Sequence, residues 1–416
     1  MRILFATDQY LPTPGGISIV TQRISIALAA KGHTVAIIAP SISWKFRKEI
    51  KRGVTIYSIQ SVLVHKLKQL RYSPTFLYWK RINNVIENFK PDIIHLETPN
   101  TIASETLKLA KKLDIPVVAT CHIMPENISG TLPFLPSKIG KIVGDLYMKQ
   151  VIKLFNKVDF VTAPTPIGVA ILDAYNIERP KMALSNGIDL TQFQKPTQEA
   201  VGKVRKKYNI PDLPIILYIG RLDKEKKVDI LVESLQYLKK TQPFHLILEG
   251  KGQQMEMLQD LVQKLELQNK VSFIGYVDEY ELPVLYALST VFVMPSTAEL
   301  QSLVTMEAMA MGLPVIGAHA GALPYLIKPD QNGFLFEPDN PEDLASKLEQ
   351  ILEDRDMQKR MSKESLRLIK EHDINNIIVK MEELYVKVIE EHKLIPLSEG
   401  NQDSTVRIPL AVDESI

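Results

Sequence analysis

Two glutamates eight positions apart, Glu299 and Glu307, lie in the segment 291–315, where the residues best suited to chemistry are concentrated. The segment opens with an apolar run that predicts a buried strand, and a helical pattern begins at Ser302. A helix N-terminus presents unpaired amides and a positive dipole end, so it can hold an anion such as phosphate. Glu307, about one turn into the helix, could accept two hydrogen bonds from a vicinal diol such as ribose, and Glu299 is expected to face hydroxyl groups. A phosphate beside a diol indicates a nucleotide; the alternative is two solvated acids beside an ordinary helix.

Two cations follow another predicted strand, 215–219. That strand ends in Gly220-Arg221, and Lys226 comes five residues after the arginine. Fixed cations at a strand end, facing the helix start at Ser302, suit a diphosphate and would stabilise a leaving group that gains charge as its bond breaks. The alternative is a pair of solvated side chains in a lysine-rich loop.

The first half of the chain adds two glycines and two histidines at predicted strand ends. Gly15 and Gly16 let a backbone approach a ligand closely and leave amides free for a phosphate, although loop glycines usually only form turns. His122 directly follows a strand and is expected to point into a cleft, and His95 is expected to help line it. No second histidine or cysteine stands at metal-ligand spacing, so zinc is not expected.

Strand candidates alternate with helical patterns through both halves, and they comprise 3–6, 35–39, 54–59, 93–96, 117–120, 160–163, 215–219, 244–248, 271–274, 291–294 and 315–318. This alternation predicts parallel sheets with helices on both faces and ligands at the carboxyl ends of the strands. Asn186-Gly187 and the lysine-rich stretch 195–207 are interpreted as the link between two such domains.

The composition is that of a globular protein, because 45% of the 416 residues are apolar and 24% are charged. A single cysteine excludes an internal disulfide and suits a reducing compartment. No signal peptide precedes the first strand, and no run of about 18 apolar residues could span a bilayer. We therefore expect a cytoplasmic protein, either soluble or peripheral on the inner face of the membrane.

Charge is distributed unevenly along the chain. Residues 1–165 contain 22 lysines and arginines against 10 aspartates and glutamates, whereas the remainder contains 28 against 38. Two stretches of the first half, 44–81 and 132–157, mix basic residues with aromatic or helically spaced apolar ones. Such stretches suit an anionic membrane surface. No nucleic-acid partner is expected because no nucleic-acid motif accompanies them; the alternative is the solvated face of ordinary helices.

Several short motifs occur in a characteristic order: Gly15-Gly16, Thr120-Cys121-His122, Asn186-Gly187-Ile188-Asp189 with Phe193, Gly220-Arg221-Leu222 with Lys226, Glu249-Gly250-Lys251-Gly252, Pro295-Ser296, and Glu299 and Glu307 followed by Ala308-Met309-Ala310 and Gly312-Leu313-Pro314-Val315. Over about residues 1–348, the chain resembles the retaining GT-B glycosyltransferases of glycosyltransferase family 4. The resemblance implies an α/β fold of two Rossmann-like, doubly wound parallel-sheet domains that face each other across a cleft. It implies an acceptor domain at 1–190, a nucleotide-sugar domain at 191–372, a helix at 373–394 that crosses back to the first domain, and a tail at 395–416.

The resemblance also implies a reaction. A hexose would move from a nucleotide-diphosphate sugar to an acceptor with retention at the anomeric carbon, and no cofactor or bound metal would be required. The implied catalytic residues are His122 near the reacting carbon, Arg221 and Lys226 on the diphosphate, and Glu299 on the donor-sugar hydroxyls. The implied donor-binding residues are Gly15, Gly16, Gly220, Gly275, Ser302, Leu303, Val304 and Glu307, of which Glu307 would bind the ribose.

Two departures from the family pattern bear on the donor. Lys227 stands where a glycine is common and adds charge beside the expected diphosphate. Leu300-Gln301-Ser302 replaces an aromatic-glycine pair, and this change leaves UDP-glucose, UDP-galactose and GDP-mannose open as donors. The segment 124–127 resembles members that act on lipid-linked or membrane acceptors.

We therefore predict a hexosyltransferase with a membrane glycolipid or lipid-linked acceptor. A soluble or polysaccharide acceptor is one alternative. A nucleotide-sugar 2-epimerase on the same fold is another, and it would need acid-base carboxylates in the first domain, where Glu97 and Glu126 are the candidates. The third alternative is a non-catalytic scaffold bound to a membrane.

Overall fold

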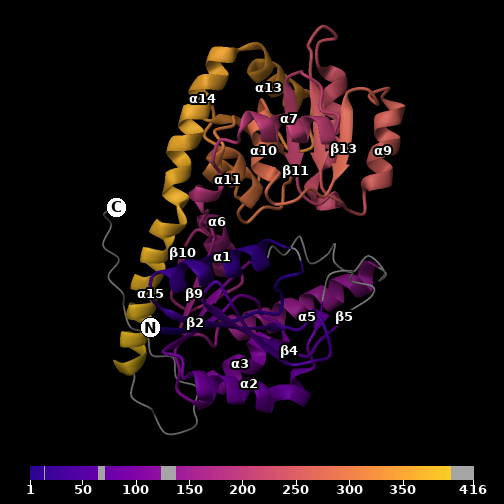
Figure 1. Cartoon of the computed structure of the whole chain (residues 1–416). Coiled ribbons are helices and arrows are strands. Elements are labelled where there is room, and N and C mark those ends of the chain that lie inside the picture. Colours follow the sequence, from indigo (N-terminus) through magenta and orange to yellow (C-terminus); the bar gives the residue numbers. More distant parts are fainter. Residues whose placement is uncertain (14, 64–70, 123–136, 395–416) are drawn as a thin grey trace.

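A computed structural model describes residues 1–13, 15–63, 71–122 and 137–394, with the side chains of 137–141 excepted. Figure 1 shows two α/β domains, one above the other, joined along one side by the last helices of the chain. The tail 395–416, Glu126 and the segment 124–127 lie outside the described residues, and so does part of each of the two basic stretches.

The first domain contains an eight-stranded sheet in the order β10-β9-β8-β7-β1-β2-β4-β3. Its strands are β1 (Arg2–Ala6), β2 (Thr34–Pro40), β3 (Arg47–Lys51), β4 (Val54–Ile59), β7 (Ile93–Leu96), β8 (Val117–Thr120), β9 (Phe160–Ala163) and β10 (Lys181–Ala183). All neighbours are parallel except the edge strand β3, which pairs with β4 in antiparallel register. The helices are α1 (Gly16–Ala30), α2 (Thr75–Phe89), α3 (Thr101–Lys112), α5 (Ser137–Phe155) and α6 (Pro166–Ala174), and β5 (Val62–Leu63) pairs with β6 (Arg71–Tyr72).

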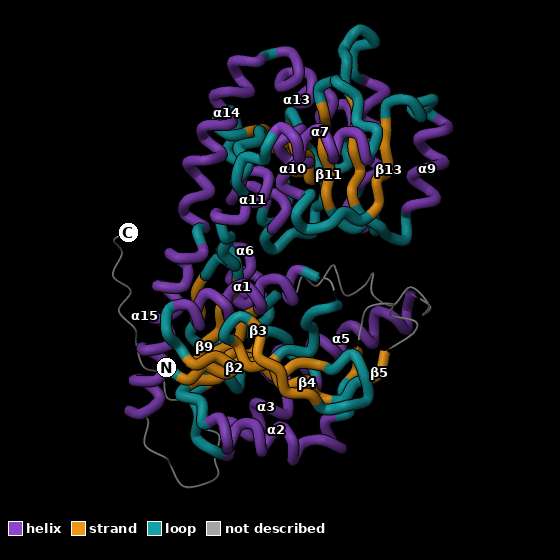
Figure 2. The backbone as a smooth tube through the Cα atoms, in the orientation of Figure 1, coloured by secondary structure: helices purple, strands orange, loops and turns teal. Residues whose placement is uncertain are grey.

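Helices cover both faces of this sheet, as Figure 2 shows. Along β1, Ile3 and Phe5 belong to the core that includes α1, whereas Leu4 and Ala6 belong to the core that includes α2 and α3. Successive side chains of a strand point to opposite faces, so a strand covered on both sides must be apolar throughout. The uninterrupted apolar run of β1 is the sequence signature of this position.

The second domain contains a six-stranded, fully parallel sheet in the order β13-β12-β11-β14-β15-β16. Its strands are β11 (Ile215–Ile219), β12 (His245–Glu249), β13 (Val271–Gly275), β14 (Val291–Met294), β15 (Val315–Ala318) and β16 (Gly333–Phe336). Its helices are α7 (Gln198–Lys207), α8 (Val228–Ser234), α9 (Met255–Lys264), α10 (Leu282–Leu288), α11 (Leu303–Ala310), α12 (Leu323–Leu326), α13 (Pro341–Glu353) and α14 (Arg355–Leu368), with 3-10 turns η1 (Leu190–Gln192), η2 (Lys224–Lys226), η3 (Leu235–Tyr237) and η4 (Ile369–His372). The predicted pair of parallel α/β sheets is therefore confirmed.

The stretch 195–207, interpreted from sequence as part of the domain link, is instead largely helical. Helix α7 starts after Thr197, whose side chain accepts a hydrogen bond from the Ala200 amide at 3.2 Å. Val204 lies in the core of the second domain, so burial of one apolar face fixes a helix whose other positions are lysine-rich. The lysine-rich composition of 195–207 is therefore that of the solvent-exposed face of α7 and not of a linker.

The chain crosses between the domains twice at one place. The Ile188 amide donates to the His372 carbonyl at 2.8 Å on the outward crossing, and the Ile374 amide donates back to the Ile188 carbonyl at 2.9 Å. Gly187 has a φ of +69°, and a Cβ there would lie 2.7 Å from the Ile374 side chain. A larger residue would therefore separate the two crossings.

The last helix, α15 (Ile374–Leu394), runs back along the first domain (Figure 1). Its apolar face enters the first-domain core through Ile377, Met381 and Tyr385. None of the described helices is both long enough and apolar enough to cross a membrane.

His95 does not line the boundary between the domains as expected. Its side chain is completely buried, with Nδ1 2.6 Å from the Tyr385 hydroxyl and Nε2 2.6 Å from the Thr120 hydroxyl. Burial lowers the pKa of His95. Strand alternation turns this side chain toward α15, where it supplies polar contacts between strand and helix.

Candidate active site

The carboxyl ends of β11 and β14 bring a cation and a carboxylate together. Lys226 Nζ lies 2.6 Å from Glu299 Oε1, although 73 positions separate the residues in sequence. The two side chains are only 17% and 10% exposed. The Ser296 hydroxyl donates to the Glu225 carbonyl at 3.2 Å and ties the same two loops together. Both strands belong to the point where strand order reverses, which is where open α/β sheets bind ligands.

Arg221 is close to Lys226 in sequence, but among the described residues its side chain has ion-pair partners other than the Lys226–Glu299 pair. Its guanidinium contacts Asp223 and Glu225 on its own loop, and the side chain is half exposed. To bind a diphosphate, Arg221 would have to exchange these acids for phosphate oxygens, so its assigned role stays a prediction.

The glycines after β12 are needed because the loop after β11 passes very close to their backbone. A Cβ at Gly250 would lie 1.9 Å from the Gly220 carbonyl oxygen, and one at Gly252 would lie 2.2 Å from the Leu222 carbonyl oxygen. The loop after β12 therefore passes directly over the loop that carries Arg221. Gly275, at the end of β13, has its nearest neighbour in the Lys251 side chain at 3.8 Å and leaves more room.

The N-terminus of α11 lies close to the N-terminus of α1 from the other domain, and Figure 1 shows both helices where the two domains meet. A Cβ on Gly16 would lie 3.8 Å from Leu303 Cδ1, so the two helix starts nearly touch. Ser302 caps α11, because its hydroxyl accepts from the Thr305 amide at 3.4 Å. The amides of Leu303 and Val304 lie in the first turn, where a helix provides no internal acceptor. Gly15 precedes α1 at its N-cap position.

Glu307 is buried on α11. The Tyr286 hydroxyl donates to its Oε2 at 3.0 Å, and an Arg23 guanidinium nitrogen lies 3.9 Å from its Oε1. Burial raises the pKa of Glu307 to about 6. Glu249, at the end of β12, is also buried, and burial raises its pKa to about 7. Two protonatable carboxyls therefore lie close to the expected ribose position.

His122 follows β8, and its Nε2 lies 2.7 Å from Glu97 Oε2 at the end of β7. The two side chains are 7% and 1% exposed. Burial opposes ionisation of Glu97, but the imidazoles of His95 and His122 lower its pKa below the ordinary value. The Glu97 carboxylate therefore accepts the Nε2–H of His122, which leaves Nδ1 for another partner. Glu97 Oε1 is buried and has no hydrogen-bond partner among the described residues.

The two departures from the family pattern have structural explanations. The Gln301 side chain accepts from the Asn186 amide at 2.8 Å and donates to the Ser185 hydroxyl at 2.9 Å, so it holds the domain crossing. Lys227 adopts a φ of +53°, a region that favours glycine, and pairs with Asp339 at 2.7 Å on the surface.

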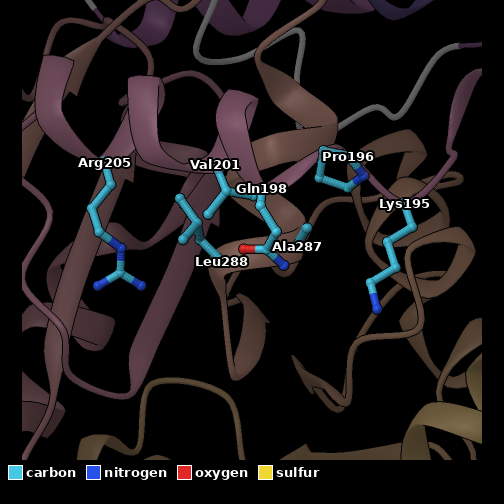
Figure 3. Close-up of a pocket in the computed structure, with 7 residues that line it drawn as sticks. All are labelled: Lys195, Pro196, Gln198, Val201, Arg205, Ala287 and Leu288. Carbon is cyan, nitrogen blue, oxygen red and sulfur yellow. The ribbon is translucent and has the colours of Figure 1, made fainter.

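No metal centre accompanies this site among the described residues. They hold no group of three or more His, Cys, Asp or Glu side chains suited to a metal ion; the metal-free expectation stays a prediction. A cavity of about 240 Å³ lies in the second domain, where Val201 and Arg205 of α7 face Leu288 of α10 (Figure 3). It shares no lining residue with the Lys226–Glu299 pair.

Two family models together match most of the chain. The model described as Glycosyltransferase Family 4 matches residues 14–192, and the model described as Glycosyl transferases group 1 matches residues 201–367. The first covers most of the first domain, and the second covers the parallel sheet that carries Lys226, Glu299 and Glu307.

Individual relatives also match most of the chain. The chain is 28% identical to an alpha-monoglucosyldiacylglycerol synthase of Streptococcus pneumoniae over 78% of its own length and 72% of that protein. It is 26% identical to a GDP-mannose-dependent alpha-mannosyltransferase of Corynebacterium glutamicum over 100% of its length and 96% of that protein. Its fold matches the crystal structure of HepE from Anabaena in complex with UDP-glucose with a TM-score of 0.74, 19% identity, and coverage of 92% and 99% of the two chains. The chain belongs to the GT-B glycosyltransferases, with a Glycosyltransferase Family 4 first domain and a Glycosyl transferases group 1 second domain.

Proposed function

We propose that this glycosyltransferase moves a hexose, with retention of anomeric configuration, from a nucleotide-diphosphate sugar on the second domain to an acceptor on the first. The observation that carries the proposal is the contact of Lys226 with Glu299 beside the N-terminus of α11. A cation and free helix amides suit a diphosphate, and a carboxylate suits the hydroxyls of the sugar attached to it.

Departure of the nucleoside diphosphate would develop negative charge on the bridging oxygen. Lys226 and the first-turn amides of Leu303 and Val304 would take up that charge as the sugar–oxygen bond breaks. Glu299 would exchange its contact with Lys226 for contacts with sugar hydroxyls, while Glu307 would accept hydrogen bonds from the ribose. Positioning and leaving-group stabilisation would then supply most of the rate acceleration.

A screen of three donors tests this function. Incubating the protein with UDP-glucose, UDP-galactose and GDP-mannose is expected to give slow hydrolysis of one of them, measured as released nucleoside diphosphate. The names of the relatives, which include a glucosyldiacylglycerol synthase and a GDP-mannose-dependent enzyme, support this choice. Absence of hydrolysis and of binding for all three would contradict the proposed donor class.

The acceptor is proposed to be a membrane glycolipid or lipid-linked sugar. Helix α2 exposes Phe76 by 68%, Leu77 by 58% and Trp79 by 42%, and α5 exposes Ile142 and Leu146 by 59% each. Exposed basic residues accompany both groups, namely Lys80, Arg81, Lys149 and Lys153. Apolar side chains of this size beside cations favour the interface of an anionic bilayer. The name of the Streptococcus pneumoniae relative, a diacylglycerol glycolipid synthase, points the same way.

Liposome flotation tests the membrane part of the proposal. The protein is expected to float with vesicles containing phosphatidylglycerol, and flotation is expected to weaken as salt rises because basic side chains contribute. The variant Phe76→Ser/Leu77→Ser should bind less, whereas Tyr237→Ser/Met257→Ser, which changes two exposed residues of the second domain, should bind like the unmodified protein. No flotation at low salt, or equal loss in both variants, would contradict a first-domain membrane face.

A further inference from the structure

One cation of the first domain reaches into the second. Arg23, on α1, donates from one guanidinium nitrogen to the Gly187 carbonyl at the domain crossing, at 2.7 Å. Its other terminal nitrogen lies 3.9 Å from Glu307 Oε1. The Arg23 side chain is only 10% exposed, so it contacts the crossing and the expected ribose site at once and is largely shielded from water.

The groups around Glu307 differ in their effect on its charge. Arg23 from α1 and the Tyr286 hydroxyl from α10 favour the carboxylate, whereas Glu279 disfavours it. Glu249 at the end of β12 also interacts with Glu307 as a like charge. Burial is the largest influence and raises the pKa of Glu307 to about 6. Without a facing cation, this carboxyl would hold its proton at still higher pH.

A protonated carboxyl is a poor partner for a vicinal diol. The carboxylate can accept from both hydroxyls, whereas the acid gives up part of its acceptor capacity to become a donor. Burial also means that bulk water cannot replace the missing stabilisation of the charge.

We propose that Arg23 is a positioning residue for the donor: it holds Glu307 as a carboxylate oriented toward the ribose hydroxyls. The inference rests on the proposed function, in which Glu307 binds ribose. Because Arg23 comes from α1 and also holds the Gly187 carbonyl, the ribose site is complete only when the two domains are in contact. Donor affinity is therefore coupled to the relative position of the domains.

The test measures donor affinity against pH. Calorimetric titration from pH 5.5 to 8.5 would use UDP-glucose, UDP-galactose or GDP-mannose, whichever the unmodified protein hydrolyses. Arg23→Met removes a factor that lowers the Glu307 pKa, so that pKa rises and the loss of affinity on acidification moves to higher pH. A shift of about one pH unit corresponds to about tenfold weaker binding near pH 5.5 and little change at pH 8.5. Arg23→Lys keeps the charge and should stay close to the unmodified protein.

Repeating the Arg23→Met change in a Glu307→Gln variant distinguishes an effect on Glu307 from a general loss of donor binding. In Glu307→Gln, no carboxyl titrates at this position, so adding Arg23→Met should leave the shape of the pH profile unchanged. The inference is overturned if Arg23→Met has the profile of the unmodified protein, or if the same shift persists in the Glu307→Gln background. If the unmodified protein binds none of the three donors, both the proposed function and this inference are contradicted. If it binds a donor normally but the Arg23→Met profile is not shifted, only this inference is contradicted.

Discussion

Replacing Lys226 with alanine is expected to lower kcat for donor hydrolysis by about 10²–10³-fold, the usual effect of removing one group that stabilises charge developing in a transition state. Lys226 is the largely buried cation held 2.6 Å from Glu299, beside the start of α11. Its removal would leave the departing diphosphate with the amides of that helix alone. Steady-state release of nucleoside diphosphate measures the effect.

The adjacent lysine provides a matched control. Lys227 has a side chain that is 31% exposed and pairs with Asp339 on the surface. Lys227→Ala removes the same charge one position away and keeps a residue with a Cβ at a φ of +53°, so the backbone strain is unchanged. Activity should stay within about threefold of the unmodified protein, since surface pairs contribute little. Equal losses in the Lys226 and Lys227 variants would mean that overall charge, rather than position, is responsible.

The second large effect is expected at His122. Its imidazole is held by the Glu97 carboxylate at 2.7 Å, and the proposed role is a hydrogen bond to the donor sugar near the reacting carbon. His122→Ala is expected to lower kcat by about 10²-fold, because small errors in placing the reacting sugar have effects of that size. Single-turnover hydrolysis with saturating protein measures the chemical step directly.

Changes at Glu97 distinguish orientation from acid-base chemistry. Glu97→Gln keeps an oxygen that can accept the Nε2–H of His122, whereas Glu97→Ala removes it. If Glu97 only orients His122, the glutamine variant should be nearly fully active and the alanine variant should resemble His122→Ala. Equal loss in both variants, with a 2-epimer of the sugar nucleotide among the products of the unmodified protein, would favour proton transfer by Glu97 and the epimerase alternative. Circular dichroism and the melting temperature would show whether each variant is folded.

The fold could be predicted from local patterns where strands are buried on both faces. The continuous apolar runs of β1, β11 and β14 identified them, because central parallel strands need apolar side chains throughout. The short strand β16 and the exposed edge strand β3 were missed: an edge strand has one unpaired side and tolerates polar residues, as RKEIK does. Likewise, α7 was mistaken for a linker because its apolar positions are few.

The contacts across the domain boundary could not be predicted, because no pattern in the neighbouring sequence indicates them. Arg23 and Gly187 are 164 positions apart, and Arg23 lies in a helix whose sequence suggests only core packing. Gln301 looked like a change in donor recognition, but its side chain holds the domain crossing at Ser185 and Asn186. Lys226 was identified because it follows a strand end in a recognisable motif. Glu299 was identified too, but its contact with Lys226 could be found only by folding β11 beside β14.

A crystal structure with the donor that the protein hydrolyses would show directly where the diphosphate binds. We expect the diphosphate at the N-terminus of α11, with an oxygen within hydrogen-bond distance of Lys226 Nζ and of the Leu303 or Val304 amide, and the ribose on Glu307. A diphosphate bound elsewhere, with Lys226 still paired to Glu299 and the α11 amides facing no phosphate oxygen, would contradict this expectation.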